Sequence, residues 1–438
     1  MMWHDIARSL SSAIAWIWHD DRGISGTVVA IVLPGLIGFG ALGVETGLWY
    51  TIKLRNQSAA DAAAISAAYE VLAGKTDVAN DLRPAASQAA TQNGYSGTAP
   101  AAVIYPYSDS VVSNGVAVAL QQTQGAFLAS MFLSGVTIAT KAVAVIEVLD
   151  NPCILALGTS GRDVEISGIS RIDMPECSVA ANSVGNSAID LHDSTSSITA
   201  ATLVTPGEIS LQGNPIDPAA PPSQFTLTSR PMIGAPAITD PYASTLTHTF
   251  LTSGMPHTCA AGPPYPANSQ ICGGLSINSA TVDLLPGTYW ITDGDLILQS
   301  NAVLNGTGVT IVLTTTDTST GIVGNVNIFR GATVTLQASN SAPFSGLLLI
   351  QDSASAISPG VTYTPGGSSF QGGANMRLDG LIYFPNTTVA FAGNPSTRCA
   401  VLISYQAVIR ESSNFTTTEC STVGLTTLPT VNTVALFE

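Results

Sequence analysis

The sequence predicts a multidomain protein: an N-terminal transmembrane helix that continues into a small α+β domain, followed by an all-β right-handed parallel β-helix, or solenoid. Three features of the 438-residue chain predict this class. A long uncharged run lies near the start, the residues after about 101 alternate like antiparallel strands, and the remainder consists of short apolar stretches separated by Gly, Asn and Ser. We expect domain boundaries at 1–22, 23–48, 49–150 and 151–438.

The uncharged run covers residues 23–44. At a rise of 1.5 Å per residue, a helix of about 22 residues crosses a hydrocarbon core about 30 Å thick. The alternative is a cleaved secretory signal, for which Ala41-Leu42-Gly43 is a tolerable cleavage site. The apolar part of a signal is only about 7–15 residues long, however, and three aspartates precede this run. We therefore predict an uncleaved anchor, preceded by a cytoplasmic amphipathic segment over residues 1–22.

The end of this run predicts a helix–helix contact. Gly43 and Gly47 frame a small-xxx-small element that lets two helix backbones approach closely. Glu45 is either an intramembrane functional acid or an acid at the water-accessible interface, and its position at the end of the run favours the interface. The residues 57–73 are alanine-rich and contain no glycine or proline, which favours a helix that continues beyond the membrane. We expect helix association to involve the patterned small and polar residues here: Gly43, Glu45, Gly47, Gln57 and Asp61.

The residues after this helix predict the membrane-proximal domain. A second helix is expected over about 77–92. From residue 101 the period changes to that of strands, with runs at 116–120 and 136–146 and turns at Ser113-Asn114-Gly115 and Ser134-Gly135. A long helix with a small antiparallel sheet makes an α+β domain.

Beyond residue 151, strands of three to five apolar residues alternate with corners rich in Gly, Asn and Ser. A solenoid coil requires this pattern, because each coil buries its inward side chains only against its neighbours. No strict repeat can be written, so a β-sandwich with Greek-key links is the alternative. The proline-rich residues at about 212–286 predict an extended excursion across the solenoid.

All six cysteines follow the uncharged run. An even number confined to the exported part indicates disulfides in an oxidising compartment, whereas buried free cysteines in a cytosolic protein are the alternative. Six cysteines allow about 15 connectivities, so the sequence alone leaves the pairing open. Pairing between sequence neighbours closes the shortest loops, and on that basis we expect Cys153 with Cys177, Cys259 with Cys272, and Cys399 with Cys420.

The composition excludes several classes of function. The net charge is −15 and no lysine follows Lys141, so no basic stripe can neutralise the phosphates of nucleic acid. The five histidines are scattered, and no zinc, nucleotide or nucleophile motif occurs. We predict no metal, no cofactor and no catalytic residue.

One alternative, a polysaccharide-degrading β-helix enzyme, would use two acids on adjacent coils as general acid and base. Asp293 with Asp295, or Asp352 with Asp379, could supply the pair. Aspartates in a solenoid are ordinarily corner residues that bind their own backbone, and we favour that interpretation.

Several motifs together resemble a known family. Arg22-Gly23 leads into the apolar run, and Gly43-Val44-Glu45-Thr46-Gly47, Tyr50 and residues 57–64 follow. This pattern, over about residues 21–69, resembles the TadE/TadG-like proteins of the bacterial tight-adherence (Flp) pilus assembly system. The exported region resembles the β-rich C-terminal part of many TadG-like proteins through Asp240-Pro241-Tyr242-Ala243, residues 272–275, 286–291 and 306–311, and Gly380-Leu381-Ile382-Tyr383-Phe384-Pro385-Asn386.

The resemblance has one departure. Pilin-like relatives are cleaved after a glycine and carry glutamate five residues later, where this chain has Val28, so processing by a prepilin peptidase is not implied.

The resemblance implies a non-enzymatic accessory protein of pilus assembly that is anchored by a single pass in the inner membrane, with most of the chain in the periplasm. Its expected partners are other pilus-assembly membrane proteins and the pilin filament. The alternatives are a surface adhesin or carbohydrate-binding β-helix protein and, third, the polysaccharide-degrading enzyme.

Overall fold

The computed structural model describes residues 24–97, 100–108, 115–127, 130, 133–149, 152–353, 359–371, 376–393, 399–417 and 431–437. The chain divides into two compact units, one of residues 1–146 with 434–438 and one of residues 147–433. The predicted division near residue 150 lies close to the observed one, but the end of the chain returns to the first unit. The second unit is therefore an insertion in the sequence of the first, whereas the sequence predicted one domain over 151–438. The predicted segment over 1–22 lies outside the described residues.

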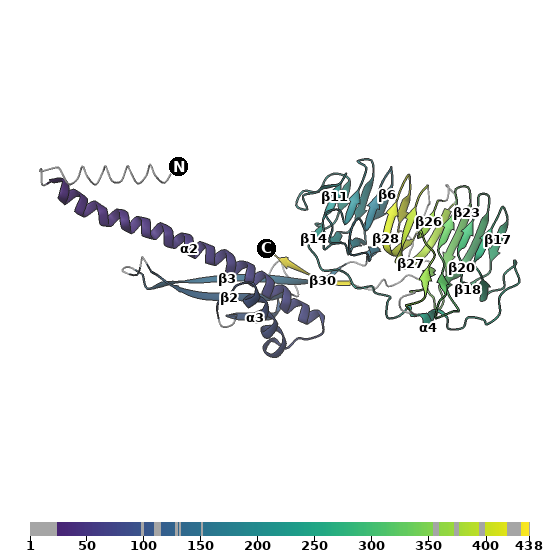
Figure 1. Cartoon of the computed structure of the whole chain (residues 1–438), viewed down its shortest axis with the longest axis horizontal. Coiled ribbons are helices and arrows are strands. Elements are labelled where there is room, and N and C mark those ends of the chain that lie inside the picture. Colours follow the sequence, from purple (N-terminus) through teal and green to yellow (C-terminus); the bar gives the residue numbers. More distant parts are fainter. Residues whose placement is uncertain are drawn as a thin grey trace. The chain divides into compact units, whose positions relative to one another are not determined.

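The first unit is built on one long helix, α2 (Ile24–Leu72), shown in purple in Figure 1. The helix runs without a break through the predicted boundary at residue 48, because residues 57–64 are strong helix formers without glycine or proline. It ends before Gly74, whose φ of +82° suits glycine after a helix C-terminus. No helix in the described part of the chain is both long enough and apolar enough to cross a membrane.

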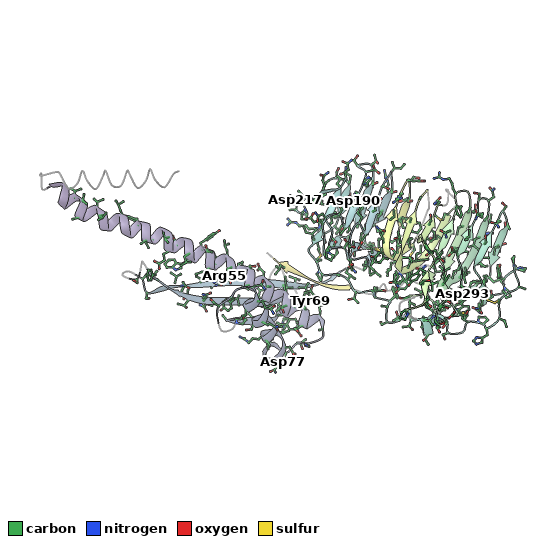
Figure 2. The ribbon with its side chains drawn as sticks, in the orientation of Figure 1. Arg55, Tyr69, Asp77, Asp190, Asp217 and Asp293 are labelled. Atoms are coloured by element: carbon green, nitrogen blue, oxygen red, sulfur yellow. A yellow bond between two sulfur atoms is a disulfide. The ribbon has the colours of Figure 1, made fainter. Side chains whose placement is uncertain are left out.

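A short helical segment follows α2. The π-helical turn η1 (Val78–Leu82) begins at Asp77, whose carboxylate accepts hydrogen bonds from the backbone N–H groups of Ala79 and Asn80 (Figure 2). It leads directly into α3 (Arg83–Gln92), which has proline in its first turn, where no N–H donor is needed. Together η1 and α3 occupy the stretch over which the second helix was predicted.

Four strands complete this unit: β1 (Ala102–Tyr107), β2 (Gly115–Gly125), β3 (Gly135–Leu149) and β30 (Val431–Phe437). Their order in the sheet is β1-β2-β3-β30. Strands β1 and β2 pair antiparallel, and β2 and β3 form a long antiparallel hairpin from Gly115 opposite Val145 to Gly125 opposite Gly135. The final strand of the chain is therefore the edge strand beside β3.

Alanines of α2 form the core of the first unit. They repeat at a spacing that places them on one face of the helix, and all are fully buried: Ala59, Ala60, Ala63, Ala64, Ala67 and Ala68. They pack in one cluster with Leu82 and Ala86 from the helical segment and with Val116, Val118 and Leu120 of β2. Because alanine is small, the helix lies close to the sheet and to α3.

The second unit consists of short strands stacked in parallel. Its first rungs are β4 (Pro152–Ala156), β5 (Val164–Ile166) and β6 (Arg171–Met174), then β7 (Ser178–Ala181), β8 (Ile189–Leu191) and β9 (Ser197–Ala200), then β10 (Leu203–Thr205), β11 (Ile209–Leu211) and β13 (Phe225–Leu227). Strand β7 pairs in parallel with β4 and β10, β8 with β5 and β11, and β9 with β6 and β13. Strand β14 (Met232–Ile233) pairs with β10, and β12 (Asn214–Pro215) with β11.

A second series of rungs begins after residue 268. Its strands are β15 (Ser269–Cys272), β16 (Leu275–Ile277), β17 (Thr281–Leu284), β18 (Gly287–Thr292), β19 (Leu296–Leu298), β20 (Val303–Thr314), β21 (Ile322–Val323), β22 (Val326–Ile328), β23 (Thr333–Ala338), β24 (Leu347–Gln351), β25 (Thr362–Tyr363), β26 (Ser368–Phe370), β27 (Met376–Phe391), β28 (Ala400–Ile409) and β29 (Asn414–Thr416). They too pair in parallel, for example β15 with β18 and β18 with β20.

The two series meet at the first and last rungs. Strand β28 pairs in parallel with both β4 and β5, and β29 pairs with β6. The chain thus builds outward from β4 to β14, passes to the far end of the stack at β15, and builds back until it reaches β4 again. Buried aromatic rings contribute to the interior near this junction, with Phe391 4.6 Å from Phe370 and 4.7 Å from Phe415 between ring centroids.

The segment that connects the two series covers residues 234–268, and we call it the strap. It is shorter than the excursion predicted over about 212–286, because β13 and β14 still pair with rungs and β15 already begins the second series. Its one helix is the single turn α4 (His248–Leu251). The prolines of the strap have no backbone N–H to donate to a neighbouring strand, which accounts for its irregular path.

Candidate functional site

The first part of α2 exposes apolar side chains. Between residues 28 and 44, none of the described side chains is buried. The exposed large apolar residues include Val28, Val32, Leu33, Leu36, Phe39, Leu42 and Val44. A Cβ atom added at Gly43 or at Gly47 would meet no atom within 4 Å, so the space beside both glycines is open. This stretch is an apolar surface that the unit itself does not cover.

The covered side of α2 begins at Glu45, which is only 4% exposed. Its carboxylate accepts a hydrogen bond from the backbone N–H of Phe127, at the tip of the β2–β3 hairpin. Charge-assisted bonds of this kind are stronger than neutral ones, so the contact fixes the hairpin tip to the helix. The sequence placed Glu45 among the residues for association with another helix, whereas the structure places it in a contact within its own unit.

Gln57 and Asp61 also bind within the first unit. The side-chain amide of Gln57 donates to Asp61 Oδ1 at 2.9 Å and to the backbone carbonyl of Lys141 on β3 at 3.1 Å. The structure therefore brings these two predicted residues together, one turn apart on the helix, and joins them to the sheet. Their role in binding a separate helix stays a prediction.

Asn56, a buried polar residue of α2, is not among the site residues predicted from the sequence. It is fully buried, its Nδ2 donates to Gln122 Oε1 at 3.2 Å, and its carbonyl accepts from Thr140 Oγ1 at 3.2 Å. The signal was present in the sequence: Asn56 lies four residues before Ala60 and eight before Ala64, and so belongs to the buried alanine face.

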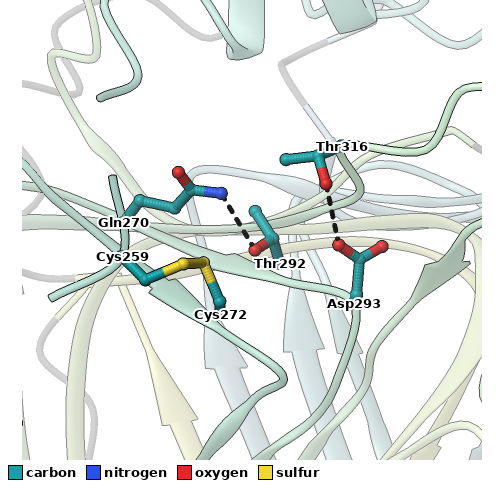
Figure 3. The surroundings of a disulfide bond; sticks show 6 residues. All are labelled: Cys259, Gln270, Cys272, Thr292, Asp293 and Thr316. Atoms are coloured by element: carbon teal, nitrogen blue, oxygen red, sulfur yellow. Dashed lines mark hydrogen bonds between the residues drawn. A yellow bond between two sulfur atoms is a disulfide. The ribbon is translucent and has the colours of Figure 1, made fainter. Parts of the chain in front are cut away.

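The predicted disulfides are formed where the structure describes both partners. Cys153 is bonded to Cys177 and Cys259 to Cys272, each with a Cα–Cα distance of 5.6 Å. Figure 3 shows the second of these bonds. Cys399 is disulfide-bonded, and its predicted partner Cys420 lies outside the described residues. No cysteine in the described part of the chain is free.

The first candidate acid pair of the second unit binds neighbouring corners. Asp293, with a φ of +57°, accepts hydrogen bonds from the hydroxyls of Thr315 and Thr316, the latter at 3.1 Å (Figure 3). Asp295 Oδ1 accepts from the backbone N–H of Asn325 at 2.8 Å. Each carboxylate thus satisfies donors of the next turn of chain, rather than of its own backbone as the corner interpretation predicted.

The second candidate pair is buried and ion-paired. Asp352 Oδ2 accepts from Thr314 Oγ1 at 2.6 Å and lies 2.7 Å from His248 Nδ1, in the strap. The bond to Asp352 raises the pKa of His248 above its usual 6.5. Asp379 pairs with Arg377 Nε at 2.6 Å. All four candidate acids therefore bind neighbouring residues of the second unit. Asp352 in addition attaches the strap to the rungs through His248.

A groove lies between the strap and the rungs, and it encloses about 400 Å³. The strap contributes Ile238 and Asp240, and the rungs contribute Asn182, Tyr383 and Tyr405. Tyr383 donates its hydroxyl to Asp240 Oδ2 at 2.7 Å. Burial, and then the hydrogen bond to Asp240, raise the pKa of Tyr383 far above its usual value, so it stays a neutral donor at physiological pH.

Two sequence motifs that line this groove were recognisable from the sequence, but their contact with each other was not. Asp240-Pro241-Tyr242-Ala243 and residues 380–386 were singled out as resembling a β-rich exported region, and the structure brings the two segments together at the Asp240–Tyr383 bond. Their proximity depends on the path of the strap, which local patterns do not reveal. Elsewhere, the described residues contain no group of three or more His, Cys, Asp or Glu side chains that could hold a metal ion.

These features define a class of protein: a helix-on-sheet unit whose helix extends beyond its sheet as an exposed apolar surface, with a second unit of parallel rungs inserted into its sequence. Residues 23–70 match the Tad family model, described as "Putative Flp pilus-assembly TadE/G-like". The match covers α2 nearly from end to end and confirms the resemblance predicted over about 21–69. No curated protein and no solved structure matches the chain significantly. The resemblance of the exported region to TadG-like proteins therefore stays a prediction.

Proposed function

We propose that this chain is a membrane-anchored accessory protein of Flp pilus assembly that acts by protein–protein binding, with both units in the periplasm. One observation carries the proposal: the segment that matches the pilus-assembly family is a single helix whose two parts have different surroundings. One part packs its alanines on its own sheet, and the other part exposes apolar side chains.

The proposed anchor is the uncharged run over residues 23–44. The hairpin begins to cover the helix at Glu45, directly where this run ends. A boundary between lipid and water at this residue explains why the preceding apolar side chains need no protein partner. Residues 1–22 would then lie in the cytoplasm.

Periplasmic location is supported by the disulfides. Cys153–Cys177 and Cys259–Cys272 both lie in the second unit, and disulfides persist in the oxidising bacterial periplasm rather than in the cytosol. The sparsely charged surface, with 10% charged residues and a net charge of −15, disfavours nucleic acid as a partner.

For the association itself we propose Gly43 and Gly47. Glu45, Gln57 and Asp61 all bind within the first unit, whereas the space beside the two glycines is open to a second helix. Gln57 and Asp61 would support this site indirectly, by holding α2 on its sheet.

For the second unit we propose a right-handed parallel β-helix that acts as a rigid body in contact with other assembly proteins or the filament. Parallel pairing of successive rungs supports a β-helix over the alternative sandwich, because sandwich sheets are antiparallel. An enzymatic role has less support, because the four candidate acids are engaged with structural partners.

The proposal is tested in a pilus-producing cell that lacks the gene. We expect loss of pili, restoration by the full chain, and fractionation of the full-length protein with the inner membrane. A photo-crosslinking residue at position 43 should capture another pilus-assembly membrane protein, whereas one at Asp217, an exposed turn residue of the second unit, should not capture that protein. A mature protein that begins near residue 44 and fractionates as a periplasmic protein would refute the anchor.

A further inference from the structure

We propose that the groove between the strap and the rungs binds a neutral saccharide. This site is independent of the docking function proposed above, since it lies wholly in the second unit. Three properties of the groove carry the inference: its size, the fixed acceptors in its lining, and its exposed aromatic ring.

The size is that of a small-molecule site. The groove encloses about 400 Å³, within the usual range of about 300–1,000 Å³ for ligand pockets. A folded partner protein would require a larger and flatter surface. The volume fits a short saccharide or one end of a longer chain.

Asp240 supplies rigid hydrogen-bond acceptors. Its Oδ1 accepts from the backbone N–H of Tyr242 at 2.9 Å and its Oδ2 from the hydroxyl of Tyr383 at 2.7 Å, so the carboxylate cannot rotate. A carboxylate has about four lone-pair sites, so acceptor positions remain for further donors. Two oxygens in one fixed plane suit two neighbouring sugar hydroxyls.

Asn386, on β27, supplies a second oriented acceptor. Its side-chain amide donates to Ser353 Oγ and to the hydroxyl of Tyr363, both at 2.8 Å. Both N–H donors are therefore used, and the direction of its carbonyl oxygen is set. Acceptors on both the strap and the rungs favour a ligand with several separated hydroxyl donors.

An exposed aromatic ring provides the apolar part of the site. Tyr405 lines the groove and is 43% exposed. Tyr383, which also lines the groove, forms an edge-to-face pair with Tyr242 with centroids 5.8 Å apart, and this contact helps to fix its ring. The C–H face of a sugar ring can lie on a tyrosine ring while its hydroxyls reach the acceptors.

The charges of the lining disfavour other ligands. Among the described residues that line the groove there is one carboxylate, Asp240, and no lysine or arginine. A phosphate or uronate would be repelled by that carboxylate and would find no cation. A purely apolar ligand would leave these acceptors without donors, which disfavours it.

The groove is formed before any ligand arrives, because the strap is fixed at several points. Asn182 exchanges two hydrogen bonds of 2.7 Å with the backbone of Ile238. Trp290 Nε1 donates to the carbonyl of Leu251 at 2.7 Å, and Cys259 is bonded to Cys272 in β15. A preformed site loses less conformational entropy when a ligand binds.

The test uses the full chain in a detergent without a sugar head group. An array of neutral hexose and N-acetylhexosamine oligosaccharides identifies a binder, and calorimetric titration measures its affinity at low and high salt. We expect binding that does not change with salt. Tyr405→Ala and Asp240→Asn should each weaken it about tenfold or more, equal to about 1.4 kcal/mol.

Matched control variants separate the groove from the rest of the surface. Tyr69→Ala changes a tyrosine that is 37% exposed on α2, and Asp217→Asn changes an exposed aspartate of a turn (Figure 2); neither should alter binding. Tyr405→Phe, which keeps the ring, should retain binding. The comparison of Tyr405→Ala with Tyr405→Phe therefore tests the groove even if Asp240→Asn proves unstable.

Three results would overturn the inference. One is the absence of any neutral saccharide bound, and another is binding that Tyr405→Ala leaves unchanged. The third is salt-dependent binding of spermidine, a cationic probe. This result counts if spermidine competes with the saccharide, or if it binds where no saccharide does. Pilus formation by a folded Tyr405→Ala variant is expected to be normal, so failure here would leave the docking proposal untouched.

Discussion

The two parts of helix α2 have opposite surroundings. Up to Val44 no described side chain from residue 28 onward is buried, whereas from Glu45 onward one face is covered first by the hairpin tip and then by the sheet. Ala60 and Ala63 are fully buried, while Gly43 faces open space. Small residues thus have two different surroundings in one helix: close packing within the unit, and open space, which we propose a partner helix occupies.

Enlarging an alanine of the buried part should have the largest effect on stability. Ala60→Leu inserts bulk between α2 and its sheet, and overpacking of this kind costs about 1–3 kcal/mol of unfolding free energy. Urea unfolding of the full chain, followed by a probe in the first unit, measures the change. Gly40→Leu on the exposed part is the control and should leave the unfolding midpoint unchanged; equal effects would mean that the two parts do not differ.

Removal of the Glu45 carboxylate tests the point where the two parts meet. Glu45→Ala removes the acceptor of the Phe127 N–H. Because Phe127 is itself exposed, water can partly replace the carboxylate, and we expect a cost of about 0.5–1.5 kcal/mol. Hydrogen exchange at the Phe127 amide should become faster. Glu45→Gln, which keeps an acceptor oxygen, should lie closer to the original protein. Unchanged protection in Glu45→Ala would show that the hairpin tip is held by other contacts.

The second unit has a comparable attachment, between His248 of the strap and Asp352, and it should respond to pH. The pKa of His248 is raised in the folded state above 6.5, chiefly by the hydrogen bond to Asp352. The stabilisation is therefore complete below pH 6.5 and is lost as the pH rises through the folded-state pKa.

Unfolding free energies of the original protein and of His248→Gln should differ most at low pH and converge at high pH. Asp163 acts in a lower pH range, because burial raises its pKa from 3.8 to about 6. Its contribution to the unfolding free energy therefore decreases as the pH rises from 3.8 to about 6. Asp163→Asn should remove only that lower part of the pH dependence. A difference for His248→Gln that grows with pH would contradict the assignment.

The smallest change in stability is expected for the open glycines. Gly43→Leu combined with Gly47→Leu fills empty space and should leave the unfolding midpoint within about 0.5 kcal/mol. Pilus assembly should nevertheless be lost, because leucine keeps a partner helix at a distance. Electron microscopy of complemented cells scores the pili, with Gly35→Leu plus Gly40→Leu as the matched pair. Normal pili in the first variant would refute helix association at this element.

Much of the fold was predictable because its signals are local. The absence of glycine and proline from residues 57–64 predicted the continuous helix, and the alternation after residue 101 predicted strands at nearly the observed positions. Two disulfides join cysteines that are neighbours in the sequence, as predicted. Cys153 of β4 is bonded to Cys177, and Cys259 of the strap to Cys272 of β15. The role of Glu45 was not predictable, because a glutamate at the end of an apolar run looks the same whether a hairpin covers it or water does.

The sequence by itself determined which residues form helix and strands, which face of α2 is buried and where the family signature lies, because these follow from periodicity and residue type within a few turns. Only the tertiary structure decided which strands are neighbours. A parallel rung has two edges with the same hydrogen-bonding groups, so β4 can pair with β7 and equally with β28, far along the chain. The same non-local pairing returns β30 to the first unit and brings Asp240 to Tyr383, and neither contact has a signature in the local pattern.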